Sequence, residues 1–201
     1  MEQHIEEHYE AVRFSGRDLQ EHSFERCVFE RCQFRHASLE EIRTTKCRFA
    51  QCDFRGALLN ASIHTGTAFE NCNFVEANLF ITQFIDCKMT GSDFANAKMD
   101  GVTLTRGDWS YTNLRQTKLA KQDLRGIRFY EADLYEVKLE NSDLRDCDLT
   151  RAIMAQTKLK GADLRGAIMD GVDFKSIDVK GARMDAMQAV AFLRSYGARV
   201  D

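Results

Sequence analysis

Two cysteines in the segment FERCVFERCQFRH, residues 24–36, have a spacing that could hold a metal ion or a redox pair. Cys27 and Cys32 stand five residues apart, each two residues before a phenylalanine. Thiolates are common zinc ligands, and neighbouring thiols can form a disulfide. However, the seven cysteines are an odd number, and the N-terminus, MEQHIEEHYEA, is acidic where a signal peptide would be basic. We therefore expect reduced thiols in a cytoplasmic protein.

The segment HIEEH, residues 4–8, fits the H-x-x-E-H pattern of some zinc peptidases. It lies at the N-terminus, and the sequence offers no evident third ligand. We interpret residues 1–11 as an exposed polar lead-in segment, and we expect no metal and no cofactor. The chain also lacks a glycine-rich phosphate loop and a convergent Ser/His/Asp or Cys/His set, so we expect no enzymatic activity and no catalytic residues.

Composition limits the remaining classes of function. A chain of 201 residues forms one domain with a sizeable core. Its net charge of −3 gives no reason to expect direct binding to nucleic acid or to anionic membranes. No apolar run approaches the roughly 18 residues of a membrane-spanning helix.

An apolar residue recurs every five residues from Phe14 to Met184, and only Thr44 and His64 break the series. We call this the central residue of each five-residue unit. The residue two positions before it is usually small. Five residues of an α-helix turn through about 500°, so the central residues would spiral around a helix instead of forming a stripe. In an extended strand the small residue and the central residue of a unit point to the same face, but the next small residue is three positions on and would point to the other face. Short extended segments separated by bends therefore satisfy the pattern.

A second period of 20 residues sets the number of sides. Phenylalanine and then leucine open four successive sets of four units, beginning at Phe14 and Leu19. This favours an all-β solenoid over residues 12–184, a four-sided coil of about nine turns spaced ~4.8 Å apart. All seven cysteines fall two residues before a central residue, which predicts that they fill space as small hydrophobic side chains. The predicted core of the first side is Phe14, Phe34, Phe54, Phe74, Phe94, Leu114 and Leu134.

Thr44 and His64 are 20 residues apart and should stack on one side. One interpretation is a contact site. We favour a locally shifted register in which Ile42 and Ile63 fill the core, because a buried imidazole without partners would cost a few kcal/mol.

The C-terminal segment, residues 185–201, predicts a capping helix. Asp185 is suited to the N-cap, AMQAVAFLRSY to a helix, and Gly197 to its end. Apolar residues occupy two sides of this helix, so one can pack on the last coil and the other on a second copy of the chain. We predict a homodimer with the interface residues Met187, Val190, Phe192 and Leu193.

The units ADLRG, ADLYE and ANLFI resemble the A(D/N)LXX consensus of pentapeptide-repeat proteins, over residues 12–186. The resemblance implies a right-handed quadrilateral β-helix. The uninterrupted coils and the closing segment GARMDAMQAVAFLRSYGARV are similar to the Qnr and MfpA group. In that group the C-terminal helix forms a dimer, and the negative rod imitates duplex DNA in the DNA-binding saddle of DNA gyrase. This implies a non-enzymatic partner of DNA gyrase and topoisomerase IV that protects them from quinolones. Some Qnr proteins carry loops, and their absence here makes the chain more similar to the MfpA type.

A DNA mimic should carry a negative stripe. Sorting the units by side from residue 67 onward predicts two adjoining negative sides, with a positive side among the other two. The candidate gyrase-facing residues are Glu70, Glu76, Asp93, Asp108, Asp133, Glu136 and Asp170. The alternative is a scaffold with a partner other than a topoisomerase, in which these charges only keep the rod soluble.

Overall fold

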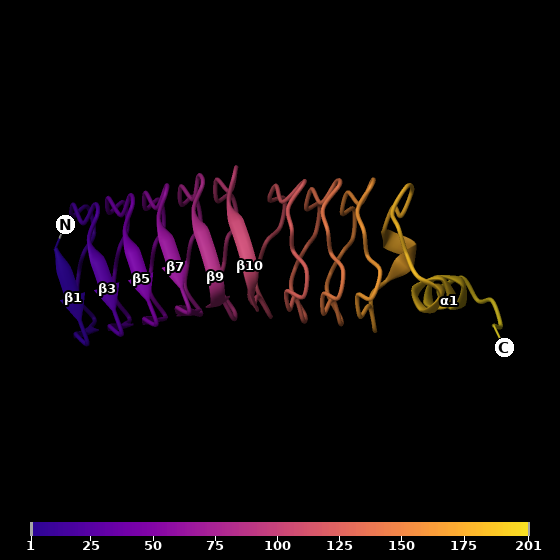
Figure 1. Ribbon diagram of the computed structural model, residues 1–201, viewed down its shortest axis with the longest axis horizontal. Coiled ribbons are helices and arrows are strands. Elements are labelled where there is room, and N and C mark those ends of the chain that lie inside the picture. The colour runs from indigo at the N-terminus through magenta and orange to yellow at the C-terminus, as the bar shows by residue number, and fades with distance from the viewer. Residues whose placement is uncertain (1, 201) are drawn as a thin grey trace.

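The five-residue units form the sides of a four-sided coil in the computed structural model, which describes residues 2–200. Register partners lie 20 residues apart: Phe24 pairs with Thr44, and Thr44 pairs with His64, all in parallel. The coils stack into a rod with β1 at one end and the helix α1 at the other (Figure 1). The right-handed quadrilateral β-helix expected from the sequence is confirmed as a parallel β-solenoid with one C-terminal helix.

We name the four sides after their first central residues: the Phe14, Leu19, Phe24 and Phe29 sides. The strands β1, β3, β5, β7, β9 and β10 stack along the Phe24 side (Figure 1), and β2, β4, β6 and β8 lie on the Phe29 side. Isolated bridges continue the same parallel register as far as residue 183. The strands are β1 (Gln3–Ile5), β2 (His8–Glu10), β3 (Ser23–Glu25), β4 (Val28–Glu30), β5 (Arg43–Thr45), β6 (Arg48–Ala50), β7 (Ile63–Thr65), β8 (Ala68–Glu70), β9 (Gln83–Lys88) and β10 (Thr103–Asp108), followed by the 3-10 helix η1 (Phe174–Ser176) and α1 (Ala186–Ser195).

The β-helix begins earlier than the sequence predicted. β1 pairs with β3 and β2 pairs with β4, so residues 3–10 belong to the first coil. The rings of His4 and Tyr9 occupy central positions and stack on Phe24 and Phe29 at centroid distances of 4.7 and 4.8 Å. The interpretation of residues 1–11 as a lead-in segment is therefore wrong for residues 3–10. The repeat was not recognised here because Glu2 and Glu7 stand two positions before His4 and Tyr9, where other units have a small residue. An end coil does not need small residues at these positions.

Each side ends in a corner whose backbone is left-handed. The residue two positions after the central one has a positive φ, as at Glu76 (60°) and Glu136 (56°). The amide of Ala37 donates to the carbonyl of Phe34 at 3.1 Å and closes one such turn. Left-handed backbone costs ~1–2 kcal/mol for a residue with a side chain. The ladder bonds to the neighbouring coils hold the corners against this cost.

Stacked side chains fill the inside of the rod. On the Phe14 side, the rings of Phe54 and Phe74 lie 4.8 Å apart with an interplanar angle of 2°. Trp109 is fully buried against Phe94 and Phe84, which makes it a core residue. Aromatic pairs add ~0.5–1.5 kcal/mol each beyond their buried area. All the expected core positions of this side are buried, namely Phe14, Phe34, Phe54, Phe74, Phe94, Leu114 and Leu134.

The seven cysteines are all free and buried. Cys27, for example, is buried at the inner position of its unit, and its thiol donates to the carbonyl of His4 at 3.5 Å. Burial raises the pKa of Cys87 and Cys147 to about 12. The thiols thus pack as small side chains, as their phase in the repeat predicted.

The predicted register shift at Thr44 and His64 is wrong. Both residues keep their central positions and are buried, while Ile63 remains partly exposed. Hydroxyl groups satisfy the imidazole: Thr44 Oγ1 lies 2.8 Å from Nδ1 and Ser62 Oγ lies 3.0 Å from Nε2. The His64 ring also stacks on Phe84 at 5.1 Å. With both nitrogens paired, the desolvation cost that favoured a shift does not arise.

Burial makes His64 a source of acid sensitivity. Desolvation lowers its pKa to about 3 in the folded chain, against about 6.5 when it is unfolded. Between these values the unfolded chain binds the extra proton, so stability falls as the pH falls. We expect the His64 contribution to drop by about 2 kcal/mol between pH 7 and pH 5. Urea unfolding at pH 5, 6 and 7 measures it.

The variant His64→Phe should lose this part of the pH dependence, because phenylalanine does not titrate. The exposed His36 provides the control, and His36→Gln should keep the wild-type slope. Equal slopes for wild type and His64→Phe would contradict this account.

Candidate binding surfaces

Three of the predicted acidic residues help to build the coil. Asp93 accepts a hydrogen bond through Oδ1 from the amide of Ala95, two positions on, at 2.9 Å. Asp108 and Asp133 make the same bond at 2.9 and 3.0 Å. This Asx turn fixes the corner that follows. Replacing any of the three would change the backbone as well as the charge.

Basic neighbours compensate the acidic residues on the Phe29 side. Glu70 lies between Arg48 at 3.0 Å and Lys88 at 2.8 Å. The hydrogen bond from Lys88 is the main reason that the pKa of Glu70 is lowered. Asp108 lies 3.8 Å from Arg128. Cations and anions therefore alternate on this side, and its charge is largely cancelled.

The Phe14 side holds carboxylates whose partners are neutral. The carboxylate of Asp93 accepts a hydrogen bond from the side-chain amide of Asn113 at 2.9 Å, and the carboxylate of Glu136 accepts one from the side-chain amide of Gln116 at 2.7 Å. These hydrogen bonds orient the carboxylates without removing their charge, and the Gln116 bond lowers the pKa of Glu136. Glu76 has no ion pair within residues 2–200. Glu76 and Glu136 occupy the same row of corners, three coils or about 14 Å apart.

The remaining two acidic candidates differ from these. Asp133 lies on the Phe14 side but pairs with Arg115 at 3.0 Å, and that guanidinium covers the ring of Tyr135 at 4.3 Å. Asp170 lies on the Phe29 side, in the last coils beside α1. The structure thus brings Glu76, Asp93, Asp133 and Glu136 together on one side and leaves Glu70, Asp108 and Asp170 on the next.

A row of four lysines marks the Leu19 side. Lys98, Lys118, Lys138 and Lys158 hold the same position in successive coils, and bridges join Lys118 to Lys138 and Lys138 to Lys158. In the described part of the chain, the ion pair of this row is that of Lys118 with Asp100, at 3.3 Å. The sequence analysis identified only the net positive charge of this side. Stepping by 20 through the position before each central residue would have found the row.

The Phe24 side carries matched ladders of opposite charge. Asp123, Asp143 and Asp163 each pair with the arginine two positions on, at 2.7, 2.6 and 2.7 Å. The hydrogen bond from Arg165 is the main reason that the pKa of Asp163 falls to about 2. The charge of the rod is therefore polarised, with the acidic residues on the Phe14 side and the lysine row on the adjoining Leu19 side.

Gln188 attaches the C-terminal helix to the last coils. Asp185 caps the helix by accepting from the amide of Gln188 at 3.1 Å, and the Gln188 side chain accepts in return from the amide of Asp185 at 3.1 Å. Its Nε2 also donates to the carbonyls of Leu164 and Ala167. The Leu164 carbonyl also accepts from the amide of Ala167 at 2.9 Å, whereas the Ala167 carbonyl has Gln188 as its partner at this end of the solenoid. Sequence reasoning missed Gln188, although the D-x-x-Q spacing of a capping box points to it.

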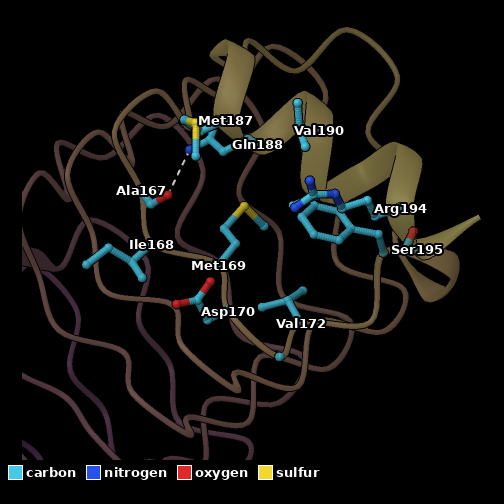
Figure 2. A pocket seen from close by; sticks show the side chains of 13 residues that line it. Ala167, Ile168, Met169, Asp170, Val172, Met187, Gln188, Val190, Arg194 and Ser195 are labelled. Carbon is cyan, nitrogen blue, oxygen red and sulfur yellow. Dashed lines mark hydrogen bonds between the residues drawn. The ribbon is translucent and has the colours of Figure 1, made fainter. Parts of the chain in front are cut away.

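The four predicted interface residues divide into two groups. Met187 and Leu193 are 78% and 48% exposed. Phe192 turns back to the rod and meets the ring of Phe174 edge-on at 5.9 Å. Val190 lines a groove of about 550 Å³ between α1 and the last coils. Figure 2 shows Met169 and Val172 of the coil across this groove from the helix.

None of the helices over residues 2–200 is long and apolar enough to cross a membrane.

The chain is similar to proteins of known structure. A trypsin-treated variant of QnrB1, described as a plasmid-mediated fluoroquinolone resistance protein, shares 20% identity with it. The alignment covers 98% of this chain and 99% of that one, with a TM-score of 0.87. Full-length QnrB1 aligns with 20% identity over 95% and 100% of the two chains, with a TM-score of 0.80.

HetL, a pentapeptide-repeat protein involved in heterocyst differentiation regulation in the cyanobacterium Nostoc sp. strain PCC 7120, shares 23% identity. The match covers 91% of this chain and 89% of HetL, with a TM-score of 0.52. No curated protein sequence matches the chain.

Family models agree with the geometry of the coil. The model for pentapeptide repeats matches residues 10–43, 45–79 and 147–185. The model for a pentapeptide repeat region matches residues 77–152. Together with the 20-residue register and the four stacked sides, these matches show that the chain belongs to the pentapeptide-repeat family.

Proposed function

We propose that the protein is a non-enzymatic DNA mimic that binds DNA gyrase and topoisomerase IV and protects them from quinolones. The shape of the whole rod carries the proposal. At similar identity, the TM-score is 0.87 with QnrB1 but only 0.52 with HetL. Since HetL has pentapeptide repeats too, the repeat alone does not account for the closer likeness to a fluoroquinolone resistance protein.

The charge distribution supports the same partner. A protein groove that binds DNA is basic, and carboxylates can take the place of phosphates in it. On the Phe14 side, Glu76, Asp93 and Glu136 keep their charge because their partners are neutral or lacking among the described residues. The lysine row on the Leu19 side would be repelled by such a groove. The two sides together would fix how the rod is rotated when it binds.

Competition with DNA would explain the proposed protection, and it would also inhibit supercoiling. While the rod occupies the DNA-binding groove, gyrase cannot hold the DNA on which it acts, so supercoiling slows. The same occupancy lowers the amount of gyrase–DNA complex that a quinolone can trap. Inhibition would then require more protein than protection, because protection needs only transient displacement of DNA.

A supercoiling assay with purified gyrase tests the proposal. We expect direct binding by calorimetry and, in the presence of a quinolone, supercoiling that recovers as the protein is added. Absence of binding, inhibition and protection at micromolar protein would end the topoisomerase proposal. The rod would then be a scaffold for another partner.

The acidic contact can be tested without disturbing the corners. The double variant Glu76→Lys and Glu136→Lys changes one exposed and one partly exposed residue and no Asx turn. We expect gyrase affinity to fall at least ten-fold, about 1.4 kcal/mol, because attraction becomes repulsion. Calorimetry at two salt concentrations should also show a weaker salt dependence.

The matched control is Glu41→Lys with Asp146→Lys. Both residues lie at the same kind of left-handed corner, on other sides, and the change in net charge is equal. Equal loss of affinity in both double variants would mean that net charge, not the Phe14 side, controls binding.

We also propose that α1 forms a homodimer with a second copy. Met187 and Leu193 are exposed and the groove beside Val190 is lined largely by apolar residues. The pair Met187→Glu and Leu193→Glu should give monomers, because charges would be buried at the interface. Light scattering after gel filtration measures the mass.

Tyr111→Glu is the control for this experiment. Tyr111 is 53% exposed on the side wall of the rod, far along the chain from α1. It should leave the dimer intact. A dimer that persists in the Met187→Glu, Leu193→Glu variant would refute this interface.

A further inference from the structure

The N-terminal end of the rod gathers three side chains that can bind a metal ion. Glu2, His4 and His22 each place one ligand atom within 4.8 Å of the others. His4 is the central residue of β1 in the first coil. His22 comes from the second coil, at the inner position two residues before Phe24. The cluster therefore joins two coils at the open end of the solenoid.

The two imidazoles have a separation that suits one metal ion. His4 Nε2 lies 3.1 Å from His22 Nδ1. Two nitrogen ligands at 2.0–2.1 Å from a tetrahedral zinc ion lie about 3.3 Å apart. Oε2 of Glu2 lies 3.8 Å from Nε2 of His22, which is the other ring nitrogen from the one that faces His4. The Glu2 side chain is exposed, so it can rotate to bring an oxygen to an ion held by His4 Nε2 and His22 Nδ1.

A second carboxylate orients His4. Nδ1 of His4 lies 3.2 Å from Oε2 of Glu7, and the Tyr9 hydroxyl also donates to this carboxylate. Metal-binding histidines usually donate their other ring N–H to a carboxylate in this way. With Nδ1–H donated to Glu7, Nε2 of His4 offers its lone pair toward His22.

Packing holds both rings in place. The His4 ring stacks on Phe24 at 4.7 Å with an interplanar angle of 11°, and the side chains of His4 and His22 are only 15% and 18% exposed. Such fixed rings lose little freedom when they bind an ion. The edge of the cluster at Glu2 is open, so an ion can enter from solvent.

We propose that His4, His22 and Glu2 form a zinc site, with water as the fourth ligand, that fastens the first coil to the second. Two imidazoles and one carboxylate are a common zinc ligand set with an open position. Cys27 is buried and its thiol is directed to the His4 carbonyl, so it is not a ligand.

The proposed ligands differ from those that the HIEEH pattern suggests. His8 lies on β2 with its side chain 59% exposed and 4.0 Å from Glu30. The pattern assumes a helix, in which His4 and His8 would share a face. In the β-helix they lie on different sides, and the partner of His4 is His22 of the next coil.

Calorimetry with zinc chloride on the metal-stripped full-length chain tests the site. We expect one ion per chain, and at least ten-fold weaker binding in His4→Gln and in His22→Gln. Glu7→Gln should weaken binding about ten-fold or more through the orientation of His4. His8→Gln, the control, should bind as the wild type does.

Two further readouts separate a metal site from a hydrogen-bonded pair of histidines. Zinc should raise the melting temperature of the wild type and of His8→Gln, but not of His4→Gln. Cobalt(II) should give a visible spectrum without thiolate charge-transfer absorption. Zinc binding that is absent, or unchanged in the double variant His4→Gln, His22→Gln, would overturn the proposal.

Discussion

The parallel stacking of equivalent residues at a distance of about 4.8 Å is the constraint on which this molecule depends. Backbone ladders set that distance, and the phenylalanine rings of the Phe14 side match it, as Phe54 and Phe74 do at 4.8 Å. Because each side chain meets its own equivalent above and below, small inner residues, left-handed corners and Asx turns must all recur with the same period. A local defect is tolerated only where its partners lie within reach, as the hydroxyls around His64 do.

The surface follows from the same constraint. Residues that point outward also stack in rows, so like charges accumulate unless the sequence alternates them. The Phe29 and Phe24 sides compensate their charges, within a row at Arg128 and Asp148 and between neighbouring rows at Asp163 and Arg165. The lysine row of the Leu19 side is not alternated. On the Phe14 and Leu19 sides compensation is only partial, through Arg115 with Asp133 and Lys118 with Asp100. The rod therefore has a rotational polarity, which a smooth cylinder of the same net charge lacks.

The sequence predicted the solenoid, its four sides and the inner cysteines, because these depend only on a period and on residue size. It failed where a side chain's role depends on its neighbour in the next coil. Hydroxyl partners made His64 acceptable in the core, and an aromatic partner placed His4 in the first coil. Among the acidic candidates, the sequence could not separate Glu70, which is compensated by residues of adjoining coils, from Glu76. Periodicity indicates which residues share a row but not which atoms meet.

The 20-residue register has a consequence for how such a rod can change in length. Loss or gain of 20 residues would remove or add one whole coil and shift the end by about 4.8 Å, with every side preserved. Loss or gain of five residues would keep apolar residues inside the rod but turn all later units by a quarter of a circuit. The acidic and lysine rows beyond that point would then each move to the adjoining side. In this fold a five-residue deletion would therefore preserve the apolar repeat but change which charged residues share a side of the rod.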